Sequence, residues 1–187
     1  MAGRFSTQAE FDDLFTRFEK KVFNLIYRLV GDYEEAADLT SDTFLQALRH
    51  LEQFRAEASP FTWLYRIAVN QCKNHFRRKG VRDRAHAFSL DDQSGLAPDA
   101  EQRELADWSQ SPARLVEAGE LQRLIQEGIA ELPLESREVL VLRDLQGLSY
   151  QEIAEVLDIA PELVKSRLFR ARAGLRQRLA PYLLPEA

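Results

Sequence analysis

The segment from Val164 to Leu179 gathers side chains that are able to contact nucleic acid. It holds six basic residues and no carboxylate: Lys165, Arg167, Arg170, Arg172, Arg176 and Arg178, with Ser166 among the first of them. A guanidinium can pair bidentately with guanine, a hydroxyl can serve several bases, and either kind of positive group can contact phosphate. The chain as a whole is acidic, with 25 Lys+Arg against 30 Asp+Glu. The cluster therefore predicts a polyanionic partner for one short segment.

The residues before and within this segment predict a helix-turn-helix. Ser149 and Glu152 have the spacing of a capping box, and Pro161 suits the first turn of the helix that follows a turn at 158–160. A buried stripe at helical spacing is expected from Val164, Leu168, Ala171 and Leu175. This stripe would direct Lys165, Ser166, Arg167 and Arg170 outward, and the second helix of such a motif lies in the major groove of DNA. A helical hairpin with a merely solvated arginine face is the alternative, and the agreement of cap, turn, stripe and charge disfavours it.

The N-terminal part of the chain predicts a bundle of three helices. An apolar stripe runs from Phe11 to Leu29 and ends at Gly31. Asp32 has capping-box spacing with Glu35 at the start of a second helix, and a third helix is expected from about Thr62 to Lys79. The far end of this third helix is basic, and the loop at 54–61 before it is aromatic. Single-stranded nucleic acid is bound by such a combination, although core aromatics beside a solvated basic face are the simpler alternative.

The middle of the chain has the composition of a linker. Residues 81–120 hold nine acids and only four basic residues, together with turn formers and no sustained apolar period. We therefore expect an all-α fold of two helical domains, 1–80 and 113–187, joined by a flexible acidic linker at 81–112. The mutual position of the two lobes is expected to depend on partners, without a shared hydrophobic core.

Several function classes are disfavoured by the composition. The sequence has no apolar run of the length that a membrane span needs and no signal-peptide core, so we expect no membrane insertion and a cytoplasmic location. Cys72 is the only cysteine, and the three histidines offer no metal-ligand spacing beside it. No nucleophile–base pair stands out, so we expect neither an enzyme nor a cofactor.

Two stretches resemble, in order, the conserved parts of one protein family. LPLESREVLVLRDLQGLSYQEIAEVL followed by VKSRLFRAR resembles region 4 of the sigma-70 family, and DYEEAADLTSDTFLQALRHLEQFRAEASPFTWLYRIAVNQCKNHF resembles region 2. The chain is similar to an extracytoplasmic function (ECF, group IV) sigma factor of the RpoE-like kind. The resemblance implies a transcription initiation factor that directs core RNA polymerase to promoters and is controlled by an anti-sigma factor.

The same resemblance assigns residues to three surfaces. Docking on the β′ coiled coil of core RNA polymerase is implied for Asp38, Leu39, Asp42 and Phe44, and a further contact is implied with the β flap. Recognition of the promoter −10 element is implied for Phe54, Arg55, Ser59, Phe61, Trp63, Asn70, Lys73, Asn74 and Arg77. Recognition of the −35 element is implied for Lys165, Ser166, Arg167, Arg170 and Arg172.

The sequence departs from the family pattern at two places. Family members often have Gln-Glu where this chain has Ser41-Asp42, and Pro-x-Gly-Thr where it has Ala160 to Leu163. Leu163 removes a hydroxyl, and Glu162 adds negative charge near the DNA. Two other functions remain open: an autonomous helix-turn-helix regulator, and a sigma mimic that sequesters an anti-sigma factor. The aromatic loop beside a basic helix argues against the first, and the retained basic residues argue against the second.

Overall fold

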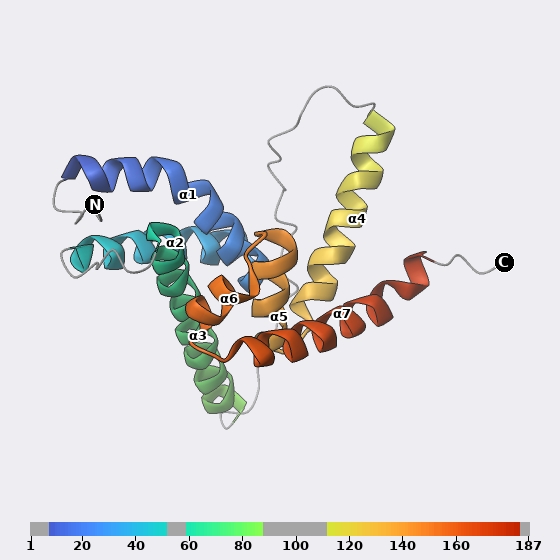
Figure 1. The fold of residues 1–187 in the computed structure, drawn as a ribbon. Coiled ribbons are helices and arrows are strands. Elements are labelled where there is room, and N and C mark those ends of the chain that lie inside the picture. The colour runs from blue at the N-terminus through green and yellow to red at the C-terminus, as the bar shows by residue number, and fades with distance from the viewer. Residues whose placement is uncertain (1–7, 52–58, 88–111, 184–187) are drawn as a thin grey trace.

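The structure, a computed structural model, describes residues 8–51, 59–87 and 112–183, and the regular elements in these ranges are helices. The N-terminal lobe comprises α1 (Gln8–Val30), α2 (Tyr33–Arg49) and α3 (Pro60–Ala87). The C-terminal lobe comprises α4 (Pro112–Ala130), α5 (Leu134–Leu140), the π-helical η2 (Val141–Leu145), α6 (Tyr150–Leu157) and α7 (Pro161–Leu183). The expected all-α fold with two helical lobes is confirmed (Figure 1). None of the helices in the described ranges has the length and apolarity needed to cross a bilayer.

The local signals at the helix ends behave as the sequence predicts. Gly31 follows α1 with a φ of +83°, and Asp32 caps α2 by accepting from the Glu35 amide at 2.8 Å. Ser149 and Glu152 form a complete capping box at the start of α6. Asp158 ends α6 in the left-handed conformation, with a φ of 56°. The capping box and Asp158 define the two ends of α6, and so the turn that sets the direction of α7.

Helix α3 is longer than the sequence analysis predicts. Ser59 caps it, since the Thr62 amide donates to Ser59 Oγ at 3.1 Å. The helix then continues past Gly80 to Ala87, into residues that we expected to belong to the linker. A single glycine within a helix costs only about 1 kcal/mol relative to alanine, and no other breaker follows it before Ala87.

The two lobes share one hydrophobic core, contrary to our expectation. Helix α3 packs against α6, and α1 packs against α4, α5 and η2. Figure 1 shows α6 against α3, whereas the far ends of α4 and α7 project away. The buried apolar residues of both lobes form a single cluster. Helix α3 explains this result: it fully buries Leu64, Tyr65, Ala68, Val69 and Cys72, which cover about 140° of its circumference. A helix with so wide an apolar face needs packing partners on more than one side.

Candidate nucleic-acid and polymerase surfaces

The outward side of α7, near its N-terminus, carries basic, hydroxyl and aromatic side chains. Lys165, Ser166 and Arg170 are exposed as expected, and Ser166 Oγ donates to the Leu163 carbonyl at 3.1 Å. Phe169 lies on the same side and is 77% exposed. The sequence analysis missed Phe169, although its spacing of three and four residues from Ser166 and Lys165 places all three on one face.

Arg167 does not belong to this outward surface. Its side chain is only 15% exposed, and its Nη2 lies 2.8 Å from Glu135 Oε2. Our expectation that Arg167 points outward is therefore wrong. The physical reason is its spacing: Arg167 is three residues from Val164 and four from Ala171, so it borders the buried stripe.

Arg172 also forms an ion pair within the protein. Its guanidinium forms a bidentate pair with Asp144, at 2.9 Å from Nε to Oδ2 and 2.5 Å from Nη2 to Oδ1. This pair ties α7 to η2. Of the five residues assigned to the −35 element, Lys165, Ser166 and Arg170 are the ones that combine exposure with a shared outward face.

The start of α3 carries part of the residues assigned to the −10 element. The ring of Phe61 is half-buried, 4.1 Å from that of Tyr65 and 5.7 Å from that of Phe18, measured between centroids. Ser59 is occupied as the cap of α3, and Trp63 is half-buried. Phe54 and Arg55 lie outside the described residues. The described aromatic side chains here therefore contribute to packing as well as to the surface.

The middle of α3 exposes amide and basic groups. Asn70, Asn74 and Arg77 are exposed, and Arg77 Nη2 donates to Asn74 Oδ1 at 3.0 Å. Lys73 is different, because its Nζ lies 3.6 Å from Glu138 Oε2 in the C-terminal lobe. The structure thus brings three of these residues to solvent and draws the fourth toward α5.

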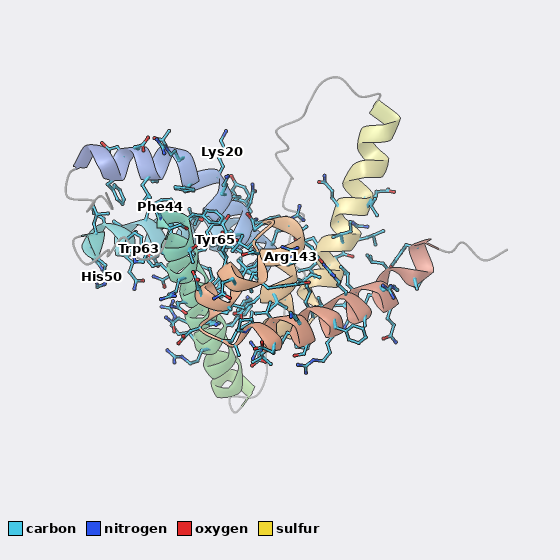
Figure 2. The ribbon with its side chains drawn as sticks, viewed as in Figure 1. Lys20, Phe44, His50, Trp63, Tyr65 and Arg143 are labelled. Atoms are coloured by element: carbon cyan, nitrogen blue, oxygen red, sulfur yellow. The ribbon has the colours of Figure 1, made fainter. Side chains whose placement is uncertain are left out.

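The face of α2 that carries Asp38 and Asp42 does not expose Leu39 and Phe44, which the family resemblance assigns to the same surface. Both carboxylates are exposed, but Leu39 and Phe44 are each only 4% exposed. The Phe44 ring packs edge-on against Phe15, with 4.7 Å between centroids. Figure 2 shows Phe44 between α2 and α1. Phe44 lies on the side of α2 that faces α1, so it does not share the exposed face of the two carboxylates. The exposed apolar residues of α2 near these carboxylates are Leu45 and Leu48.

The comparisons with known proteins agree with this arrangement. The profile of Sigma-70 region 2 matches residues 14–82, and that of Sigma-70 region 4 matches residues 122–175. The RNA polymerase sigma-H factor of Pseudomonas aeruginosa is 35% identical over 92% of this chain and 88% of its own length. The ECF RNA polymerase sigma-E factor of Escherichia coli K12 is 32% identical over 94% of this chain and 90% of its own. The chain belongs to the ECF sigma factors of the sigma-70 family.

Within this family the chain is of the sigma-E kind, and it is a transcription initiation factor. Sigma factors are not catalytic, so its surfaces act by binding. Region 2 corresponds to α1–α3, and region 4 to the C-terminal lobe.

Two solved sigma-factor structures are similar over nearly the whole chain. The sigma factor RpoE of Bartonella quintana, solved with the anti-sigma factor NepR, has a TM-score of 0.69 at 22% identity, and the match covers 91% of this chain and 97% of that one. CnrH, solved with the cytosolic domain of CnrY, has a TM-score of 0.65 at 25% identity, covering 94% and 90%.

The contact between regions 2 and 4 contains a buried carboxylate that the sequence analysis did not single out. Glu138 is 1% exposed, and its burial raises the pKa of its carboxyl to about 7 despite the opposing effects of Lys73 and Arg167. The neighbouring Arg137 is also buried, and burial lowers the pKa of its guanidinium. Its side chain donates to the carbonyls of Leu29, Ala130 and Leu132. One signal was available in the sequence, namely two adjacent charges that directly precede the apolar run Val139–Leu142.

Proposed function

We propose that this sigma factor recognises −35 DNA through the outward side of α7 and −10 DNA through α3 and the loop before it. The observation that carries the proposal is the exposed set of Lys165, Ser166, Phe169 and Arg170 on one face of a helix-turn-helix. Positive groups there contact phosphate, and the hydroxyl and the ring contact base edges and thymine methyls in the major groove. Glu162, exposed in the first turn of α7, disfavours phosphate close to that end.

On α3, the exposed groups that can meet a single strand are Asn70, Asn74 and Arg77. Amides can hydrogen-bond an unstacked base, and Arg77 and Lys73 can follow the phosphates. Phe61, Trp63 and Ser59, with Phe54 and Arg55 of the preceding loop, complete the proposed −10 surface. A flipped base costs a few kcal/mol of stacking, so a protein surface that receives it helps to keep the strands apart.

The polymerase surface is proposed to be the exposed face of α2. Asp38 and Asp42 supply charge to the β′ coiled coil, and Leu45 takes the apolar role that the sequence assigned to Phe44. Region 4 is proposed to contact the β flap of the same enzyme. An anti-sigma factor is proposed as the regulator, supported by the similarity to CnrH, which was solved with the cytosolic domain of CnrY. These partners imply a cytoplasmic protein.

Transcription in vitro tests this function. Purified core RNA polymerase is supplied with a library of promoter sequences, with and without the protein, and the transcripts are sequenced. We expect initiation at a defined set of −10 and −35 sequences only when the protein is present. Lys165→Glu should abolish it, whereas Lys20→Glu, the same charge change on the exposed surface of α1, should not. Failure to stimulate initiation on any sequence would overturn the proposed function.

A further inference from the structure

The first turn of α7 carries a carboxylate to which the proposed function gives no contact. Glu162 is exposed, and no ion pair or side-chain hydrogen bond joins it to another residue in the described part of the chain. Family members often have glycine at this position, within Pro-x-Gly-Thr, so Glu162 belongs to the departure of this chain from that pattern. Its carboxylate would face polyanionic DNA, so it needs a compensating contact there.

Glu162 lies on the same side of α7 as the residues proposed to contact the −35 element. At about 100° per residue, its side chain falls within about 60° of Lys165, Ser166 and Phe169 around the helix axis. The buried Ala171 lies on the opposite side, about 180° away. Glu162 also comes first among these outward residues, and the early residues of a recognition helix are the ones that meet base edges. The carboxylate is therefore placed to contact bases.

Two ion pairs fix the rotation of α7 about its own axis. Arg167 pairs with Glu135 of α5, and Arg172 pairs with Asp144 of η2. These two arginines border the outward face on opposite sides, because they lie about 140° and about 80° from Glu162 around the helix. Turning Glu162 away from DNA would require breaking these pairs. Its side chain is thus held at the surface that meets the major groove.

A carboxylate accepts hydrogen bonds but donates none, and this limits which bases it can recognise. In the major groove, cytosine presents its N4 amino group, a donor that Glu and Asp side chains accept from. Adenine places the N7 acceptor beside its amino group, and guanine and thymine present acceptors that repel a carboxylate. The phosphates repel it at every sequence. Glu162 should therefore lower the affinity for DNA in general, and lower it least where a cytosine is within reach.

We propose that Glu162 is a specificity-determining residue of the −35 contact, and that it selects cytosine by accepting a hydrogen bond from the N4 amino group. The inference rests on the proposed function of α7. Ser166 lies four residues further along the helix, a rise of about 6 Å, which is close to two base-pair steps of about 3.4 Å. The selected cytosine should therefore lie within about two base pairs of the pair that Ser166 contacts.

Selection from a −35 library tests this assignment. Holoenzyme assembled from core RNA polymerase and the full chain is bound to promoters with a randomised −35 region, and the bound DNA is sequenced. We expect the unmodified protein to favour cytosine at one position by about tenfold. Glu162→Ala should remove this preference and raise the affinity for the other sequences. Glu162→Gln should transfer the preference to adenine, because an amide pairs bidentately with adenine N6 and N7.

A modified base tests the hydrogen bond itself. N4-methylcytosine still pairs with guanine, but its methyl group takes the place of the amino hydrogen that faces the major groove. At the favoured position, this base should lower binding of the unmodified protein by about tenfold. Binding of Glu162→Ala should not change, because this variant has no carboxylate to lose the contact.

Glu120→Gln is the matched control, because it makes the same change at an exposed position of α4 and should leave base preference unchanged. A purely structural role of Glu162 at the helix start would lower the free energy of unfolding in Glu162→Gln, measured with urea, without altering base preference. Unchanged preference in both Glu162 variants would overturn the inference and leave the proposed function intact. Absence of −35 selection by the unmodified protein would overturn the proposed function of α7, and the inference with it.

Discussion

The Lys73 ammonium of region 2 lies 3.6 Å from the Glu138 carboxylate of region 4, and this carboxylate is almost completely buried. The contact joins a helix assigned to −10 recognition with the helix that packs against the recognition helix α7. Glu138 thus lies between the two DNA-binding regions. We therefore expect any change in the charge of Glu138 to alter how tightly regions 2 and 4 pack.

The first prediction is that closure, meaning the packing of region 4 against region 2, depends on pH through Glu138. The groups around this carboxyl are Lys73 and the Cys72 thiol on α3, Arg167 on α7, and Glu135 and Arg137 on its own helix. Burial raises the pKa of Glu138 from 4.5 to about 7. At a pH between these two values, the carboxyl therefore takes up a proton when the two regions pack together. Closure should therefore strengthen as the pH falls through about 7 and weaken as the pH rises.

Cysteines that replace the exposed Glu34 of α2 and Gln151 of α6 carry two dyes, and energy transfer between them, followed between about pH 6 and pH 8, measures this dependence. Glu138→Gln is neutral at every pH and should flatten the profile. A profile of unchanged slope in Glu138→Gln would assign the pH dependence to other groups.

The second prediction concerns core polymerase and the two sides of α2. Asp42→Lys and Leu45→Ala change exposed residues, so they should weaken core binding while leaving the unfolding transition nearly unchanged. Phe44→Ala should instead lower the stability of the fold. It removes a buried ring and should destabilise region 2 by about 3–5 kcal/mol, measured by urea unfolding. Normal core affinity in Asp42→Lys and Leu45→Ala would place the docking surface elsewhere.

The elements of the fold were predictable from the sequence because their signals are local. Gly31, Asp32 and the Ser149–Glu152 box act within one helical turn, and the structure has each of them at the predicted helix end. The family was recognisable for a related reason, since two ordered stretches carry its pattern.

The packing between the lobes was not predictable, because an apolar helix face does not identify its partner. Tyr65 and Val69 fit a buried face, but only the fold shows that Tyr65 reaches Gln146, 81 residues away. The error at Arg167 has another cause. Its side chain lies near the boundary between the inward and outward sides of α7, where a small rotation of the helix decides exposure.

The third prediction separates the residues of α7. Lys165→Ala should weaken −35 binding and reduce the salt slope by about one unit if Lys165 contacts phosphate. Phe169→Ala should alter base preference at individual −35 positions, since an exposed ring contacts bases and not phosphates. Arg167→Ala should leave base preference unchanged because Arg167 is paired with Glu135. Binding of holoenzyme to a −35 library at two salt concentrations measures all three, and altered base preference in Arg167→Ala would restore it as a reader.

The last prediction concerns strand opening. Asn70 is exposed on α3 and has the amide chemistry to hold an unstacked base, so Asn70→Ala should leave closed-complex binding through the −35 element nearly intact. It should reduce opening, which permanganate reports through the reactivity of unpaired thymines near the start site. Gln71→Ala is a suitable control, because this neighbouring amide donates to Gln46 within region 2. Equal loss of closed and open complexes in Asn70→Ala would remove Asn70 from melting and leave it as part of a solvated helix face.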